Sequence, residues 1–291
     1  MKGRKTDKDD LLGCHVSIAG GFDRAVERGA GLGCTAIQLF TRNQLRWHSK
    51  PIEREQIESF TRSLSGNTRV REVCAHGSYL PNLASPDSEI KRRSIASVKD
   101  ELERCGLLGI SCLVIHPGNH MGAGEKEGIR KVVSSLTEAM KGREGRVKVL
   151  IETTAGQGTG IGYRFEHLRD IVSGVGDAMA GVCFDTCHVF AAGYDLRGEE
   201  GYGRTLDQFE RIIGLSHIEA IHLNDSKGDF GSRRDRHQHI GEGKIGIDAF
   251  TRFMREERFT EVPKIIETPK RMNGADMDVR NLEILRALAS G

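Results

Sequence analysis

The chain has 291 residues, of which 37% are hydrophobic and 29% are charged, and this is typical of a globular protein that can bury a large core. No apolar run approaches the roughly 20 residues needed to cross a bilayer, and the N-terminus lacks the apolar segment of a signal peptide. The formal net charge of +2 neither requires nor excludes a nucleic-acid partner, because a local basic patch can act without a basic average.

In chain order, residues 1–10 (MKGRKTDKDD) form a charged tail that we expect to be disordered. After it, short apolar runs rich in β-branched residues recur, most of them about 33 to 45 residues apart, which is the length of a strand, a helix and two loops. The runs lie at 11–17, 34–40, 71–76, 110–116, 147–152, 181–185, 218–225 and 263–268. The segments between them, clearest at 89–109 and 128–142, have apolar residues at helical spacing.

Strands that alternate with helices favour a parallel sheet whose faces are covered. Eight such units predict an α/β fold, a single (β/α)8 TIM barrel, over residues 11–291. A doubly wound open sheet is the alternative, but it would more often show a glycine-rich phosphate loop after an early strand. The seven cysteines are scattered and form no C-x-x-C pair, which favours buried free thiols and a cytoplasmic location.

Six successive predicted strands carry an imidazole or a carboxylate at or beside their last residue. In a barrel these ends meet at one mouth, where like-charged carboxylates would repel one another unless cations neutralised them. One such residue alone could be a helix N-cap or a hydrogen-bonded structural residue, but six in succession are hard to explain in that way. The six residues are His76, His116, Glu152, Asp185, His222 and Glu267.

Two loops offer further ligands. His188 follows the sixth strand and is expected in a loop, and Asp235 and His237 lie two residues apart in the segment 230–246. Alternate residues of an extended segment project to one side, so Asp235 and His237 could bind one ion. His188 could complete this separate set of three ligands. Nine ligands exceed the capacity of one ion and predict two or three closely spaced zinc, manganese or ferrous ions, an arrangement suited to phosphate ester hydrolysis.

Long motifs resemble those of the endonuclease IV family, the zinc-dependent apurinic/apyrimidinic endonucleases of base-excision repair. The resemblance covers nearly the whole chain apart from the tail, and it implies a (β/α)8 barrel that binds three zinc ions, with Mn2+ as a substitute in part of the sites. The motifs are GCHVSIAGG (13–21), QLFTRNQ (38–44), HGSYLPNLA (76–84), IHPGNH (115–120), IETTAGQGTGIG (151–162), FDTCHVFAAGYD (184–195), IHLNDSKGDFGSRRDRHQHIGEG (221–243) and IIET (265–268).

The resemblance also implies a ligand set for each ion and a reaction. Hydroxide between the first two zinc ions would attack the phosphorus 5′ to an abasic site and leave a 3′-hydroxyl and a 5′-deoxyribose phosphate. Glu152 and Glu267 would be catalytic, with Glu267 orienting the nucleophile, and removal of 3′-blocking groups is a further expected activity. The sets are His76, His116 and Glu152; Glu152, Asp185, His222 and Glu267; and His188, Asp235 and His237.

DNA contacts are implied on loops around the mouth. Tyr79 and Leu80 would enter the duplex at the lesion as a wedge, and Gln44 matches a residue that contacts DNA in the family. The next position departs from the family, which often has Arg where this chain has Leu45, and Arg46 could take over by a local shift.

A cluster of arginines flanks Asp235. Arg233, Arg234 and Arg236 could bind phosphates, although a solvated charged loop is the plain alternative. The expected partner is duplex DNA with abasic sites, bound by a monomer without membrane contact or an obligate protein partner, in the cytoplasm and at the nucleoid. The rival functions are a metal-dependent sugar isomerase or epimerase on the same barrel and a non-catalytic DNA-damage binder.

Overall fold

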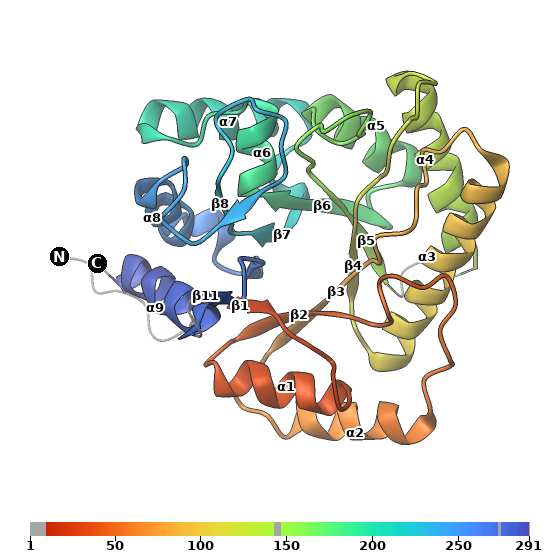
Figure 1. The fold of residues 1–291 in the computed structure, drawn as a ribbon, viewed down its shortest axis with the longest axis horizontal. Helices are drawn as coiled ribbons and strands as arrows, with labels where there is room; N and C mark the ends of the chain where they lie inside the picture. Colours follow the sequence, from red (N-terminus) through yellow and green to blue (C-terminus); the bar gives the residue numbers. More distant parts are fainter. Residues whose placement is uncertain (1–9, 143–146, 273–274, 291) are drawn as a thin grey trace.

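The computed structural model describes residues 10–142, 147–272 and 275–290. Eight parallel strands close into a barrel in which β1 pairs with both β2 and β10 (Figure 1). Each predicted strand run matches one of them, with β6 starting one residue before its run, so the TIM barrel is confirmed and the open sheet is excluded. The strands are β1 (Leu12–His15), β2 (Ala36–Phe40), β3 (Glu72–His76), β4 (Cys112–Ile115), β5 (Lys148–Glu152), β6 (Ala180–Asp185), β7 (Ile218–His222) and β10 (Lys264–Ile266).

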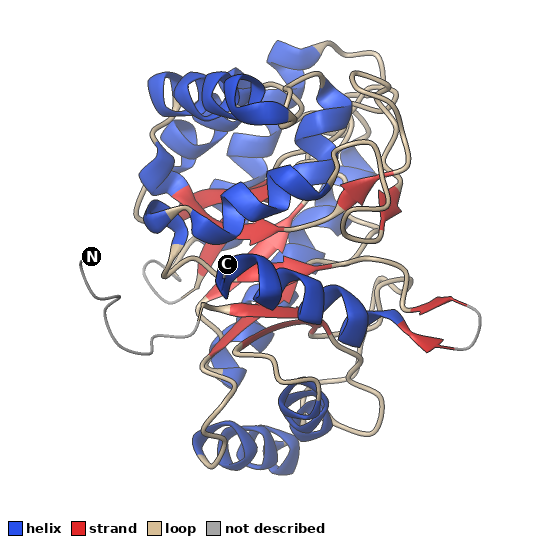
Figure 2. Ribbon diagram, turned by 90° about the vertical axis from the view of Figure 1, so that its left-hand side faces the viewer, coloured by secondary structure: helices blue, strands red, loops and turns tan. Residues whose placement is uncertain are grey.

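Helices surround the strands (Figure 2). The helix predicted at 89–109 is α3, which starts after Asp87, whose carboxylate caps the amide of Ile90, and ends at Gly109 in a left-handed conformation. The one predicted at 128–142 is α4, which begins and ends slightly earlier. The helices are α1 (Phe22–Gly31), α2 (Arg54–Ser65), α3 (Ser88–Leu108), α4 (Glu125–Met140), α5 (Phe165–Val175), α6 (Thr186–Ala192), α7 (Gly198–Ile212), α8 (Ile247–Arg255) and α9 (Met277–Ser290).

Two short hairpins were not expected from the sequence. Strand β8 (Asp225–Ser226) pairs with β9 (His237–Gln238), and β11 (Arg271–Met272) pairs with β12 (Ala275–Asp276), both antiparallel. Strands of two residues are too short to show an alternating pattern. The first hairpin returns the loop that contains Asp235 and His237 to the mouth of the barrel.

The barrel interior is filled rather than hollow. Small and medium apolar side chains from five strands pack inside it, and a larger layer lies between the strands and the helices. The seven cysteines are all buried and free, as the sequence predicted. The interior cluster consists of Cys74, Cys112, Val114, Leu150, Cys183 and Ala220.

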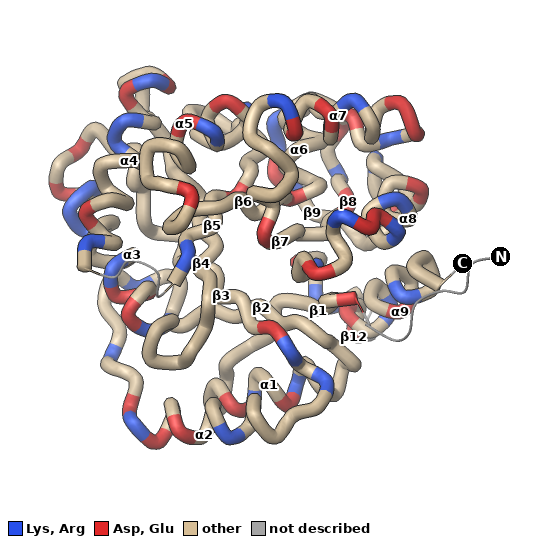
Figure 3. The backbone as a smooth tube through the Cα atoms, turned by 180° about the vertical axis from the view of Figure 1, so that it is seen from behind, with Lys and Arg blue, Asp and Glu red and all other residues tan. Residues whose placement is uncertain are grey.

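Charges of both signs are interspersed along the outer helices (Figure 3). Many form pairs one helical turn apart, such as Arg54 with Glu58 and Arg130 with Glu127, and such exposed pairs contribute little to stability because water screens them. Among the described residues, no helix combines the length and the apolar character that a membrane span requires. Of the predicted tail, residues 1–9 lie outside the described part, while Asp10 accepts a hydrogen bond from the buried Lys264 at 3.2 Å.

Strand β1 packs so closely on β2 that one of its residues must lack a side chain. A Cβ atom at Gly13 would lie 1.6 Å from the carbonyl oxygen of Ala36, its partner in the sheet. We expect Gly13→Ala to lower the free energy of unfolding by at least about 2 kcal/mol in urea denaturation, because backbone must move. Gly106→Ala is the control, since a Cβ at this helical position has nothing within 4 Å; equal midpoints for the two variants would contradict the expectation.

Candidate metal centre at the barrel mouth

The carboxyl ends of the strands bring the predicted ligands together. His76, Glu152, Asp185 and His222 are the last residues of β3, β5, β6 and β7. His116 and Glu267 each follow a strand, β4 and β10, by one residue. All six lie at one mouth because parallel strands of a barrel end on the same side.

Glu152 is the centre of the cluster and is completely buried. Its Oε2 atom lies 3.1 Å from Nε2 of His76 and 2.8 Å from Nε2 of His116. Its Oε1 atom lies 3.0 Å from Nδ1 of His222. Burial alone would raise the pKa of the Glu152 carboxyl, but the charges of His116 and His222 outweigh it and hold the pKa well below its usual range. Glu152 is therefore an ionised group with an imidazole on each of several sides.

Two groups of donor atoms share Glu152. The atoms of each group lie within 4.8 Å of one another, which is close enough to surround one cation. They coincide with the sets that the resemblance assigns to the first and second zinc ions. The groups are His76, His116 and Glu152, and Glu152, Asp185, His222 and Glu267.

Asp185 uses its two carboxylate oxygens for different purposes. Oδ1 accepts a hydrogen bond of 2.8 Å from the amide of His188 and so caps helix α6. Oδ2 faces the cluster, at 3.6 Å from Nε2 of His237. The expectation that His188 lies in a loop is wrong, because this cap starts a helix directly at the strand end and places His188 in its first turn.

His188, Asp235 and His237 meet beside the first two groups. Oδ1 of Asp235 lies 3.2 Å from Nε2 of His188 and 3.4 Å from Nε2 of His237. Their donor atoms fall into two overlapping groups, one that includes Asp185 and one that includes Cys187. The three residues that the resemblance implies therefore lie close together, but neither group contains all three of them.

The imidazoles are held so that one nitrogen of each faces the cluster. Nδ1 of His76, His188 and His237 each faces a backbone carbonyl, of Gly77 at 2.8 Å, Thr153 at 2.8 Å and Glu267 at 3.2 Å. A carbonyl can only accept a hydrogen bond, so Nδ1 donates a proton to it and Nε2 is the nitrogen that remains to bind a metal. This is the usual arrangement behind metal-binding histidines.

Two of these Nε2 atoms, in His188 and His237, are buried and have no aligned hydrogen-bond partner. Both lie near Asp235, but at angles that do not make a hydrogen bond. A buried nitrogen without a partner costs free energy. A cation between Asp235 and the two rings would satisfy both atoms, and the mixture of imidazole and carboxylate donors fits zinc, manganese or ferrous iron.

Sequence reasoning missed the residues that hold these ligands in place. Gln38, buried in β2, donates to Oε1 of Glu267 at 2.6 Å and accepts from Nε2 of His222 at 2.8 Å. Asn224 donates to Oδ2 of Asp185 at 2.7 Å and accepts from the amide of Glu267 at 2.8 Å. A glutamine inside the otherwise apolar run 34–40 was the available signal for the first of them.

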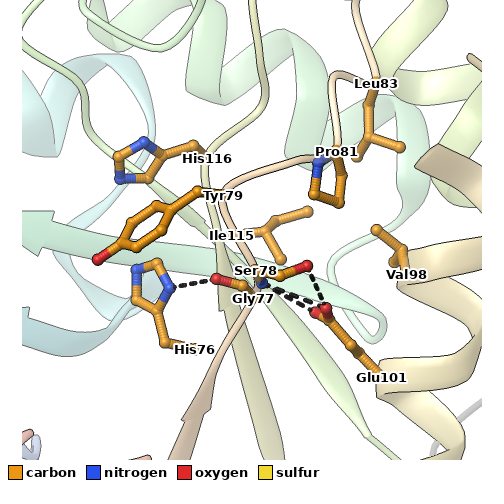
Figure 4. Close-up of a pocket in the computed structure, with 10 residues that line it drawn as sticks. All are labelled: His76, Gly77, Ser78, Tyr79, Pro81, Leu83, Val98, Glu101, Ile115 and His116. Carbon is orange, nitrogen blue, oxygen red and sulfur yellow. Dashed lines mark hydrogen bonds between the residues drawn. The ribbon is translucent and has the colours of Figure 1, made fainter. Parts of the chain in front are cut away.

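The residues predicted to contact the lesion lie on the rim with different exposures. The side chain of Tyr79 is 64% exposed, and its ring stands near His76 and His116 (Figure 4). Leu80 and Gln44 are half-buried, and Arg46 is exposed. Leu45, at the position that departs from the family, is 72% exposed.

The arginines predicted to bind phosphates are exposed beside the third ligand group. Arg233 has a left-handed backbone with φ of 53°, and its guanidinium lies 4.6 Å from the ring centre of Tyr163. Arg236 donates to the backbone carbonyl of Asp235 at 2.7 Å and lines a cleft with His116 and His188.

The chain resembles known proteins over nearly its whole length. Residues 26–288 match a family described as a xylose isomerase-like TIM barrel. The probable endonuclease 4 of Chloroflexus aurantiacus is 46% identical over 96% of this chain and 98% of its own length, and that of Geobacter sulfurreducens is 45% identical over 96% and 95%. The solved endonuclease IV of Thermus thermophilus is 36% identical, with a TM-score of 0.85 over 96% of this chain and 98% of that one. A D-tagatose 3-epimerase-like protein, 20% identical with a TM-score of 0.70, shares the fold.

Proposed function

Because this chain belongs to the endonuclease IV family and is a metal-dependent phosphodiesterase of the apurinic/apyrimidinic endonuclease class, we propose that it cuts duplex DNA 5′ to an abasic site with three zinc ions. The products would be a 3′-hydroxyl and a 5′-deoxyribose phosphate, and 3′-blocking groups would be removed at the same site. The observation that supports this most is the pair of ligand groups that share Glu152, with a third group beside them.

We propose the ligand sets named above, with Mn2+ as an alternative in part of the sites. When bound, ions this close together supply an activated water and stabilise the charge on the phosphoryl and leaving oxygens. The chain contributes their placement: Glu152 lies between the first two sets, and Asp185 lies between the second and the third.

Of the carboxylates in the two groups that share Glu152, Glu267 is the best placed to act on substrate. Its side chain is 18% exposed, whereas Glu152 and Asp185 are completely buried. Gln38 fixes one of its oxygens, and the other lies 3.2 Å from Nδ1 of His222. Glu267 can therefore accept a proton from an attacking water while Glu152 holds the surrounding imidazoles.

The rim residues would bind the DNA. Tyr79 and Leu80 would enter the base stack at the lesion, with Gln44 and Arg46 beside them. Arg233 and Arg236 would bind phosphates. We propose a monomer that acts on nucleoid DNA in the cytoplasm without an obligate protein partner.

The test is nicking of a labelled duplex that contains one abasic analogue, with the zinc-loaded protein. The expected product migrates as a strand cut 5′ to the lesion and can be extended by a DNA polymerase because it ends in a 3′-hydroxyl. An intact duplex after long incubation would refute the proposal. Ketose–aldose exchange by the same preparation would favour the sugar isomerase, and binding of the lesion without nicking would favour the damage binder.

Replacing Tyr79 by Ala should weaken the preference for abasic over intact duplex. Stacking of an aromatic ring on a base contributes roughly 1–3 kcal/mol, so we expect the ratio of the two dissociation constants to fall by about tenfold. Competition binding with matched duplexes measures it. Ile90→Ala, at an exposed position on α3, is the control; an unchanged ratio for Tyr79→Ala would remove this residue from lesion recognition.

A further inference from the structure

Two loops at the rim of the barrel mouth each carry an exposed apolar side chain. Residues of one helix, α3, bind both loops. The loop of residues 41–50, after β2, presents Leu45, and the loop of residues 77–81, after β3, presents Tyr79. Leu45 is 72% exposed and Tyr79 is 64% exposed, so both side chains are accessible to a partner that approaches the rim. Their positions are fixed by Asp100, Glu101 and Arg104 of α3 together with Arg42 of the first loop.

Glu101 of α3 holds the second loop (Figure 4). Its carboxylate is 1% exposed and accepts two kinds of hydrogen bond from Ser78, one of 2.6 Å from the hydroxyl and others of 3.2 and 3.3 Å from the amide. A Cβ at Gly77 would lie 3.2 Å from this carboxylate and 2.9 Å from Ile115, so the loop approaches the helix as closely as a glycine allows. The carbonyl of the same Gly77 faces Nδ1 of His76.

Asp100, the preceding residue of α3, holds the first loop through two arginines. Its Oδ2 accepts hydrogen bonds of 2.9 Å from both Arg42 and Arg104. Arg42 donates in turn to the carbonyl of Arg46 at 2.7 Å. Arg104 donates to the carbonyls at the two ends of the loop, Thr41 and Lys50.

Arg42 also connects Glu101, which holds the second loop, with Asp100, which holds the first. Its side chain is 2% exposed, and its buried Nε atom has no hydrogen-bond partner and lies 3.9 Å from Oε1 of Glu101. Removing Glu101 would leave the buried Arg42 without one of its two neighbouring carboxylates, which is costly for a charge that is 2% exposed. The half-buried Arg93 of α3 adds a contact of 4.5 Å from its guanidinium to the ring centre of Trp47.

We propose that Glu101 is a positioning residue for lesion recognition: through Ser78 and Arg42 it holds the two loops as one rigid unit, so that Tyr79 and Leu45 enter the duplex together. This inference rests on the proposed function. It gives Leu45 the role of a second apolar wedge. Rigid placement matters because a wedge that must first be ordered loses part of its binding free energy to that ordering.

The first test uses Glu101→Gln and Ser78→Ala in the zinc-loaded enzyme. Discrimination is the inhibition constant of an intact duplex divided by the KM of the same duplex with one abasic analogue. We expect it to fall about tenfold or more, since displacements of about 1 Å have effects of this size. Zinc content should stay unchanged.

Glu89→Gln is the matched control, because it makes the same substitution on the same helix at an exposed pair with Arg92. It should leave discrimination unchanged. Should Glu101→Gln fail to fold, Ser78→Ala decides the matter, since it removes only the hydroxyl half of the contact. Full discrimination in the folded variants, or an equal fall in affinity for both duplexes, would overturn the proposal.

The second test is a double-mutant cycle of Leu45→Ala and Tyr79→Ala. If the loops act as one unit, the loss of discrimination in the double variant differs from the product of the two single losses in the parent enzyme. When Glu101 is replaced, the double loss should equal that product. Independent effects in the parent would refute a shared wedge. Failure of the parent to nick abasic DNA would instead refute the proposed function, so the two failures are distinguishable.

Discussion

The variant Glu267→Gln should keep its fold and lose nicking, with kcat lower by about 1,000-fold or more. The amide has the shape of the carboxylate, and its oxygen can still accept the hydrogen bond from Gln38 that Oε1 of Glu267 accepts now. What disappears is the negative charge that faces His222 and the ability to take a proton. The effect should therefore fall on the chemical step rather than on DNA affinity.

Single-turnover nicking and DNA binding separate these two effects. Thermal unfolding and zinc content show whether the fold and the metals remain. Glu27→Gln, which changes an exposed carboxylate that pairs with Arg24 on α1, should leave every measurement unchanged. Near-normal turnover by Glu267→Gln would remove this residue from catalysis.

Much of this architecture could be predicted because its signals are local. The run 147–152 is apolar from Val149 to Ile151 and then ends in Glu152, and 181–185 is apolar until Asp185. The same short stretch of sequence therefore indicates both the strand and its functional residue. Once the barrel is recognised, the meeting of these ends follows from its topology, without any knowledge of the side-chain contacts.

What could not be predicted depends on contacts across the fold. Asn224 follows β7, and its importance comes from two hydrogen bonds, to Asp185 and to the backbone of Glu267, that no spacing along the chain reveals. The helical position of His188 depends on which oxygen of Asp185 turns back to cap α6. Likewise, Glu101 is one charged residue among many on an amphipathic helix until the structure places Ser78 above it.

Removal of the metals should stop nicking and also lower the thermal midpoint of unfolding. Without cations, the completely buried Glu152 and Asp185 remain close together, and Nε2 of His188 and of His237 remains without a partner. An ion present at 1,000 times its dissociation constant stabilises the folded state by about 4 kcal/mol. For a chain of this size that corresponds to a midpoint lower by about 10 °C, measured by calorimetry after chelation and dialysis.

Zinc titrated back into the chelated protein should restore the midpoint and the nicking. Elemental analysis should then find three ions per chain, whereas Asp235→Asn should hold two, because Asp235 contributes to the third set and not to the two that share Glu152. Because the first two sets remain complete, that variant should keep most of the regained midpoint. Without the third ion it should lose most of its nicking. A single ion per chain, or the same midpoint before and after chelation, would contradict a three-ion centre built on these residues.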